Sequence, residues 1–198
     1  MNQIVYGITG GTGCGKTTAL QVLQKLGFHI IDCDSLYHGL LETDAAMLQA
    51  IDSAFPGTVI NGVLQRKVLG QHVFSDAAAL DRLNRTVWPF ITDAVEAQLH
   101  AHAHQNCAID AVALSESGLG RLCRKTIAVI APEEDRVRRL MERDGISAEY
   151  ARLRIRAQRS NEDFSASCHV TLENHFRTVE EFAAHCEMIF TTILKEEP

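Results

Sequence analysis

The chain has 198 residues, of which 46% are hydrophobic, and a formal net charge of -6. This length suits one α/β domain with insertions and a core that folds alone. The negative charge disfavours general binding to nucleic acids or anionic membranes, and no apolar run approaches the length of a membrane span. Because the N-terminus lacks a signal-peptide pattern, the six cysteines are expected to be reduced thiols in a cytoplasmic protein.

Short apolar runs alternate with amphipathic stretches along the chain, a pattern that predicts a parallel sheet wrapped by helices. The first strand is expected over residues 3–9 and the first helix over residues 17–26, with Gly27 as its stop. Residues 28–31 predict a second strand, joined to the first by a right-handed crossover.

The segment Gly10–Thr17 lies between this first strand and first helix and reads Gly-Gly-Thr-Gly-Cys-Gly-Lys-Thr. It matches the phosphate-binding pattern G-x-x-x-x-G-K-S/T. Glycines let backbone N–H groups approach a polyphosphate, and the start of the helix adds its positive end. Lys16 is expected to reach the β- and γ-phosphates and Thr17 to ligate Mg²⁺. The pattern predicts a nucleoside triphosphate site, and the alternative is a plain glycine-rich turn. Cys14, inside the loop, is expected only to fill a small-residue position.

Residues 35–105 predict mostly helix, which is too much for a single crossover. Turns are expected at Pro56-Gly57 and at Asn61-Gly62, and a helix boundary at Trp88-Pro89 because proline disfavours helix in the residue before it. We interpret this stretch as an insertion that forms a second wall opposite the phosphate loop. Two histidines would share a helix face there and could hold a metal, although no third ligand is evident: His100 and His104.

The alternation of strands and helices returns after residue 106. Strands are expected over residues 107–114, 126–131 and 169–172. One helix is expected over residues 132–143, with Gly145 at its end, and a second helix is expected to start near Ser147. A final helix is expected over residues 178–195.

Basic residues concentrate in one region, with eleven of the 19 lysines and arginines between Arg121 and Arg159. Helical spacing places them on one face of each of two successive helices: Arg136, Arg139 and Arg143, then Arg152, Arg156 and Arg159. Such faces suit a flap that closes over a triphosphate, because arginine presents a planar donor fork to phosphate oxygens. The alternative is a solvated helical hairpin with Arg–Glu pairs.

Four acidic residues lie within or just after expected strands. Asp32 and Asp34 follow the second strand, where they could serve Mg²⁺ or take a proton from an acceptor hydroxyl; a plain helix cap by Asp34 is the alternative. Asp110 interrupts an apolar strand and therefore needs a cation or hydrogen-bond donors. It could ligate magnesium or be a structural aspartate, and Glu116 is similarly ambiguous.

The order of these features resembles the dephospho-CoA kinase family of P-loop kinases over nearly the whole chain. The residues that carry the resemblance are Ile8–Thr18, Leu26-Gly27, Ile31–Asp34, Gly62–Arg66 with Leu69, Val73-Phe74 and Leu83-Asn84, then Arg139-Leu140, Arg143-Asp144, Gln158 and Asn174. Some positions depart from the family pattern, namely Trp88, Val112-Ala113 and Cys168.

The resemblance implies a three-layer α/β P-loop fold with a five-stranded parallel sheet in the order 2-3-1-4-5. It implies one kinase domain with a core of residues 1–34, 106–131 and 160–198, an acceptor-binding helical insertion over residues 35–105 and a short lid over residues 132–159. The implied reaction transfers the γ-phosphate of ATP to the ribose 3′-hydroxyl of dephospho-CoA. The protein would be a monomer or a small homo-oligomer.

Roles for single residues follow from the same resemblance. The ATP phosphates would be held by Gly11, Thr12, Gly13, Cys14, Gly15, Lys16, Thr17 and Thr18, with Lys16 stabilising the transferred group. Asp34 would orient or deprotonate the hydroxyl, with Asp32 in support, and Arg66 would bind the acceptor. Arg139 and Arg143 would close on the triphosphate, and Mg²⁺ would be held by Thr17, with Asp32 or Asp110 as further candidates.

Two other functions remain open at this point. Another small-molecule or nucleotide kinase of the same fold would share the loop and lid but have a different acceptor pocket. A nucleotide-dependent switch would hydrolyse slowly, although the paired arginine faces argue against it because a switch often borrows its arginine from a partner.

Overall fold

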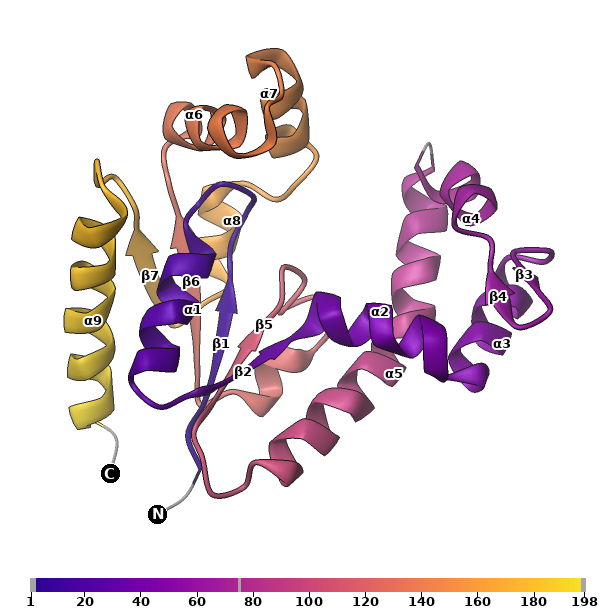
Figure 1. Cartoon of the computed structure of the whole chain (residues 1–198), viewed down its shortest axis with the longest axis horizontal. Helices are drawn as coiled ribbons and strands as arrows, with labels where there is room; N and C mark the ends of the chain where they lie inside the picture. Colours follow the sequence, from indigo (N-terminus) through magenta and orange to yellow (C-terminus); the bar gives the residue numbers. More distant parts are fainter. Residues whose placement is uncertain (1–2, 75, 197–198) are drawn as a thin grey trace. The chain divides into compact units, whose positions relative to one another are not determined.

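The computed structural model describes residues 3–74 and 76–196, and the chain forms two compact units (Figure 1). The first unit runs up to Ile30 and resumes at His102. The second unit is the continuous stretch Ile31–Ala101.

A parallel five-stranded sheet forms the centre of the first unit, in the order β2-β5-β1-β6-β7 (Figure 1). Its strands are β1 (Val5–Thr9), β2 (His29–Asp32), β5 (Cys107–Asp110), β6 (Lys125–Ile130) and β7 (Val170–Glu173). Counted along the chain within this sheet alone, the order corresponds to the expected 2-3-1-4-5. The labels differ from that expectation because a small hairpin, β3-β4, intervenes in the second unit and was not predicted.

Most helices of the first unit follow the predicted alternation, but the helix over residues 161–166 and the 3-10 turn over residues 119–122 were not predicted. The unit contains α1 (Lys16–Lys25), the 3-10 turn η1 (Leu119–Leu122), α6 (Glu133–Asp144), α7 (Ala148–Arg156), α8 (Asn161–Ala166) and α9 (Val179–Glu196). Gly27 and Gly145 follow α1 and α6 with φ of 89° and 66°, which confirms both expected helix stops. Ser147 caps α7 by accepting a hydrogen bond from the Tyr150 N–H.

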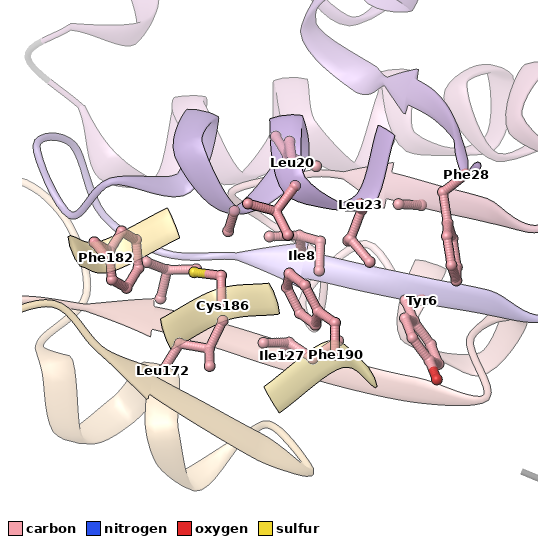
Figure 2. Close-up of a cluster of buried hydrophobic side chains, with 14 of the residues drawn as sticks. Tyr6, Ile8, Leu20, Leu23, Phe28, Ile127, Leu172, Phe182, Cys186 and Phe190 are labelled. Carbon is pink, nitrogen blue, oxygen red and sulfur yellow. The ribbon is translucent and has the colours of Figure 1, made fainter. Parts of the chain in front are cut away.

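The core of the first unit lies where α1 and α9 cover one face of the sheet (Figure 2). Leu20 and Leu23 of α1 pack with Phe182 and Phe190 of α9 against apolar strand side chains, of which Ile8 is fully buried. Because β1 is buried along its whole length, it holds the loop that follows it in a fixed position.

The strand expected over residues 107–114 is shorter than predicted and ends at Asp110. The apolar run continues beyond it, but the chain turns, with the Ser117 N–H donating to the Ala113 carbonyl. Ala111 and Leu114 are nonetheless buried, so their hydrophobicity reflects packing in a turn rather than membership of the sheet.

The second unit is mostly helical, as expected. It contains α2 (Cys33–Thr43), α3 (Ala45–Ala54), α4 (Arg66–Val73), α5 (Ala77–Ala101) and the two-residue strands β3 (Val59–Ile60) and β4 (Val63–Leu64). The expected turn at Asn61-Gly62 joins β3 to β4, and both residues have positive φ, at 52° and 76°.

The helix boundary expected at Trp88-Pro89 was wrong, because Pro89 lies inside α5. An apolar face along this helix, including Leu83, Val87, Ile91 and Val95, is buried in the second unit, and this packing outweighs the local preference of proline. α5 ends at Ala101, so His104 is not on the helix face expected for it.

Within residues 3–74 and 76–196, no cluster of three or more His, Cys, Asp or Glu side chains could hold a metal ion. No helix of this same part of the chain has the length and apolar character needed to cross a membrane.

Candidate active site

The phosphate loop lies between β1 and α1, as predicted. Gly15 precedes the first residue of α1 in the left-handed region, with φ of 102°, and no side chain caps the helix start. The first N–H groups of α1 are therefore available to an anion, and the helix dipole adds positive potential there. This is the geometry of a phosphate site.

Several loop glycines are also required by protein packing. A Cβ on Gly10 would collide with the Val129 carbonyl oxygen, one on Gly11 with the guanidinium of Arg136, and one on Gly15 with the Asn174 amide. The loop therefore packs directly against polar groups of the first unit. Glycine is needed for this packing as well as for the close approach of a phosphate to the loop backbone.

Lys16 forms an ion pair with Asp110, and both side chains are less than one-fifth exposed, at 19% and 16%. This pair supplies the cation that a carboxylate in an apolar strand requires. It also places the ammonium group of Lys16 at the carboxyl end of β5, the edge at which parallel sheets bind ligands.

Arg136 and Arg139 of α6 reach the backbone of the phosphate loop. The Arg136 Nε donates to the Thr12 carbonyl at 2.9 Å, and the Arg139 Nη1 donates to the Gly13 carbonyl at 3.2 Å. Arg136 is only 3% exposed, and burial lowers the pKa of Arg139 from its ordinary value. Both guanidiniums thus lie behind the loop in the structure and add positive charge to it.

Arg143, on the same predicted helix face, has different partners. It forms a two-pronged pair with Asp144, at 2.6 and 3.0 Å, and Arg154 of α7 binds the same carboxylate at 2.6 Å. The hydrogen bonds from these two arginines lower the pKa of Asp144 to about 2. The Arg154–Asp144 pair therefore joins α7 to α6, and Arg143 binds the same carboxylate from within α6.

The second arginine face expected on one helix was wrong for Arg159, because α7 ends at Arg156 and Arg159 lies beyond it; Arg152 and Arg159 pair with acids. Arg152 donates to Glu134, and Arg159 donates to Glu116, which accounts for that glutamate. The region is thus a helical hairpin with paired charges on its outside and two arginines, Arg136 and Arg139, directed at the loop.

Three other loop residues differ in environment. Cys14 is fully buried in the core cluster, and burial raises the pKa of its thiol, so the side chain fills space while its backbone belongs to the loop. Thr17 is exposed on the first turn of α1, and Thr18 is half-buried.

Two side chains of the loop's surroundings were given no role by sequence reasoning. Asn174 is buried, donates to the Cys14 carbonyl at 2.9 Å and accepts from Arg139 at 3.1 Å. The Gln158 Oε1 accepts from the Thr12 N–H at 2.7 Å. The position of Asn174, immediately after β7, was a usable signal, since ligand sites gather at strand ends.

In the second unit, the carboxylate of Asp32 caps α2. It accepts from the N–H groups of Asp34 and Ser35 at 2.9 and 3.1 Å and from the Ser35 hydroxyl at 2.8 Å. The helix cap expected as the alternative role of Asp34 therefore belongs to Asp32. Asp34 lies exposed in the first turn, and its carboxylate has no hydrogen-bond or ion-pair partner within the described residues.

Arg66 begins α4 in the same unit, close to Tyr37. Burial raises the pKa of Tyr37, and the positive charge of Arg66 partly opposes that rise. Arg66 has no carboxylate partner in the part of the chain that the structure describes, so its charge is available to an anionic ligand.

Solved structures support the fold. A crystal structure of TT1252 from Thermus thermophilus aligns over 100% of both chains with a TM-score of 0.79 and 30% identity. A dephospho-CoA kinase from Campylobacter jejuni aligns over 98% of both chains with a TM-score of 0.68 and 25% identity. A shikimate kinase from Bacteroides thetaiotaomicron, at 14% identity and a TM-score of 0.52, shares the fold alone.

Sequence comparison gives the same family. The chain is 33% identical over 178 residues to a dephospho-CoA kinase of Dehalococcoides mccartyi, and this alignment covers 87% of this chain and 89% of that protein. It is 30% identical over 197 residues to one of Fusobacterium nucleatum, covering 96% and 100%. The family model for dephospho-CoA kinase matches residues 4–180, and the chain therefore belongs to the dephospho-CoA kinase family.

Proposed function

We propose that this protein transfers the γ-phosphate of ATP to the 3′-hydroxyl of dephospho-CoA, the last step of coenzyme A biosynthesis. The observation that carries the proposal is the uncapped start of α1 behind a glycine loop, with Lys16 and two arginines beside it, in a chain of this family. Phosphoryl transfer requires positioning and charge stabilisation, which these groups supply.

On the donor side, residues Gly11–Thr18 hold the phosphates and Lys16 leaves Asp110 to follow the γ-phosphoryl group. Arg139 supports the loop from behind and adds positive charge near the transferred group. Arg143 reaches the triphosphate only by giving up Asp144, so its proposed role depends on a rearrangement of the α6–α7 hairpin.

On the acceptor side, Asp34 is the proposed base or orienting group for the hydroxyl. The hydrogen bonds of Asp32 favour this assignment, since they commit the Asp32 carboxylate to the helix cap and leave that of Asp34 exposed. Arg66 binds an anionic group of the acceptor, a role suited to a guanidinium with no carboxylate partner in residues 3–74 and 76–196.

Mg²⁺ fits the residues present. The exposed Thr17 hydroxyl on the first turn of α1 is a suitable ligand, and Mg²⁺ in such sites takes most of its ligands from phosphates and water. When bound, the ion neutralises charge on the phosphates. Asp110 contributes to this site only after Lys16 is drawn away, and Asp32 only after its cap is loosened.

The test offers the purified protein ATP with dephospho-CoA, and separately with nucleoside monophosphates, and follows ADP release. Release that depends on dephospho-CoA supports the proposal. Release with a monophosphate instead would indicate another kinase of the same fold, and slow release without any acceptor would indicate a nucleotide-dependent switch. We further propose one kinase domain that acts in the cytoplasm as a monomer or small homo-oligomer.

A further inference from the structure

Both backbone polar groups of Thr12, in the phosphate loop, are held by side chains from the two ends of the α6–α7 hairpin. The Thr12 N–H donates to Gln158 Oε1 at 2.7 Å, and the Thr12 carbonyl accepts from Arg136 Nε at 2.9 Å. Gln158 and Arg136 also touch each other, at 3.4 Å from Nη2 to Oε1. Arg136 stands near the start of the hairpin and Gln158 just after its end.

Packing shows that this contact is specific. A Cβ on Gly11 would collide with the Arg136 guanidinium, and a Cβ on Gly13 would come within 3.0 Å of the Arg136 carbonyl oxygen. The phosphate-binding pattern leaves both positions free, so it does not explain why they are glycines. Contact with Arg136 explains Gly11, and at Gly13 it adds to a φ of 77° that by itself favours glycine.

The charge of Arg136 is not neutralised in this structure. The side chain is 3% exposed, and its hydrogen bonds go to amide oxygens of Thr12, Gln158 and Asn161. Within the described residues it forms no ion pair. A buried cation without a carboxylate is costly, and an anion bound in the adjacent loop would offset that cost.

We propose that Arg136 and Gln158 act together as positioning residues that fix the two peptide groups on either side of the Thr12 Cα and thereby set the loop for the ATP phosphates. This inference rests on the proposed function, because it assumes that the loop binds ATP. The proposal means that α6 is attached to the phosphate loop through Arg136. Movement of the hairpin during turnover would then be transmitted to the phosphate site through the backbone of Thr12.

The test compares ATP dissociation constants, measured by calorimetry, for Gln158→Ala, Arg136→Lys and the control Arg138→Ala. Arg138 lies on the same helix but is exposed and pairs with Asp135. We expect about tenfold weaker ATP binding for each of the first two variants, as for loss of a hydrogen bond to a buried partner, and a change below about twofold for the control.

Kinetics separates positioning from general damage. The KM for ATP should rise in both variants while the KM for dephospho-CoA stays the same. Gln158→Met, which keeps the length of the side chain but has no oxygen to accept from the Thr12 N–H, should weaken ATP binding as much as Gln158→Ala. The loss of ATP affinity in the double variant should be smaller than the product of the two single losses, because both side chains hold the backbone of the same residue, Thr12.

Wild-type affinity in both Gln158→Ala and Arg136→Lys would overturn the proposal, and so would fully multiplicative losses. If Arg136→Lys fails to fold, as shown by its melting temperature, the two Gln158 variants decide alone. Failure of the wild-type protein to bind ATP would instead refute the proposed function, so the two failures are distinguishable.

Discussion

Asn174→Ala should destabilise the protein through the phosphate loop. The amide donates to the Cys14 carbonyl at 2.9 Å and accepts from Arg139 at 3.1 Å, and the side chain is buried. Removing it leaves a buried carbonyl without its donor and takes one partner from a charged donor, at about 1–2 kcal/mol each. The sum is about 3 kcal/mol, a large share of the roughly 5–15 kcal/mol that stabilises a typical protein.

Thermal unfolding measures this effect. A loss of about 3 kcal/mol should lower the Tm by roughly 6–12 °C in a protein of this size. Asn174→Asp keeps the acceptor for Arg139 but turns an oxygen toward the Cys14 carbonyl, so it should not restore the stability. Gln21→Ala, at an exposed site on α1, should change the Tm by less than about 2 °C. An Asn174→Ala protein that melts together with the Gln21→Ala control would refute the idea that this amide supports the loop.

Three further predictions concern catalysis, pH and thiol reactivity. Asp34→Asn should leave ATP binding intact and lower kcat by roughly a hundredfold or more, and a fully active variant would remove its role as base. The pKa of Asp144 falls from 3.8 to about 2 through Arg143 and Arg154, so its stabilising effect is complete above about pH 4 and is lost as the pH falls through 2. Asp144→Asn should accordingly lower the Tm at pH 7, and the gap from wild type should close near pH 2; a gap independent of pH would contradict the assignment. Burial raises the pKa of Cys123 to about 12, so this thiol should resist iodoacetamide at pH 8 until the protein is unfolded, as peptide mass mapping would show.

Local patterns in the sequence were sufficient for much of the fold. The phosphate loop, the helix stops at Gly27 and Gly145 and the turn at Asn61-Gly62 all depend on residues close together in the chain. Pro89 was misjudged because a long apolar face stabilises α5 around it. The strands β3 and β4 were missed because two residues each are too few to show alternation.

The environment of the loop was harder to predict. Thr12 meets Arg136 and Gln158, which lie 124 and 146 residues further along the chain, and no local pattern carries such pairing. The spacing of the arginines on α6 predicted a shared helix face. It did not predict that Arg143 would bind Asp144 while Arg136 and Arg139 bind the phosphate loop. Which of several equivalent charges meets which partner is decided by tertiary packing.

The second unit is one uninterrupted stretch, and the chain leaves and re-enters the first unit at neighbouring points. His29 stacks on His102 with ring centroids 3.6 Å apart, and the His29 N–H donates to the Asn106 carbonyl at 2.8 Å. A segment whose ends are so close can be exchanged, lengthened or shortened without a change in the strand order of the sheet. We propose that the second unit binds the phosphate acceptor. On that proposal, acceptor selectivity could diversify during evolution by replacement of this one segment, while the nucleotide-binding first unit stayed unchanged.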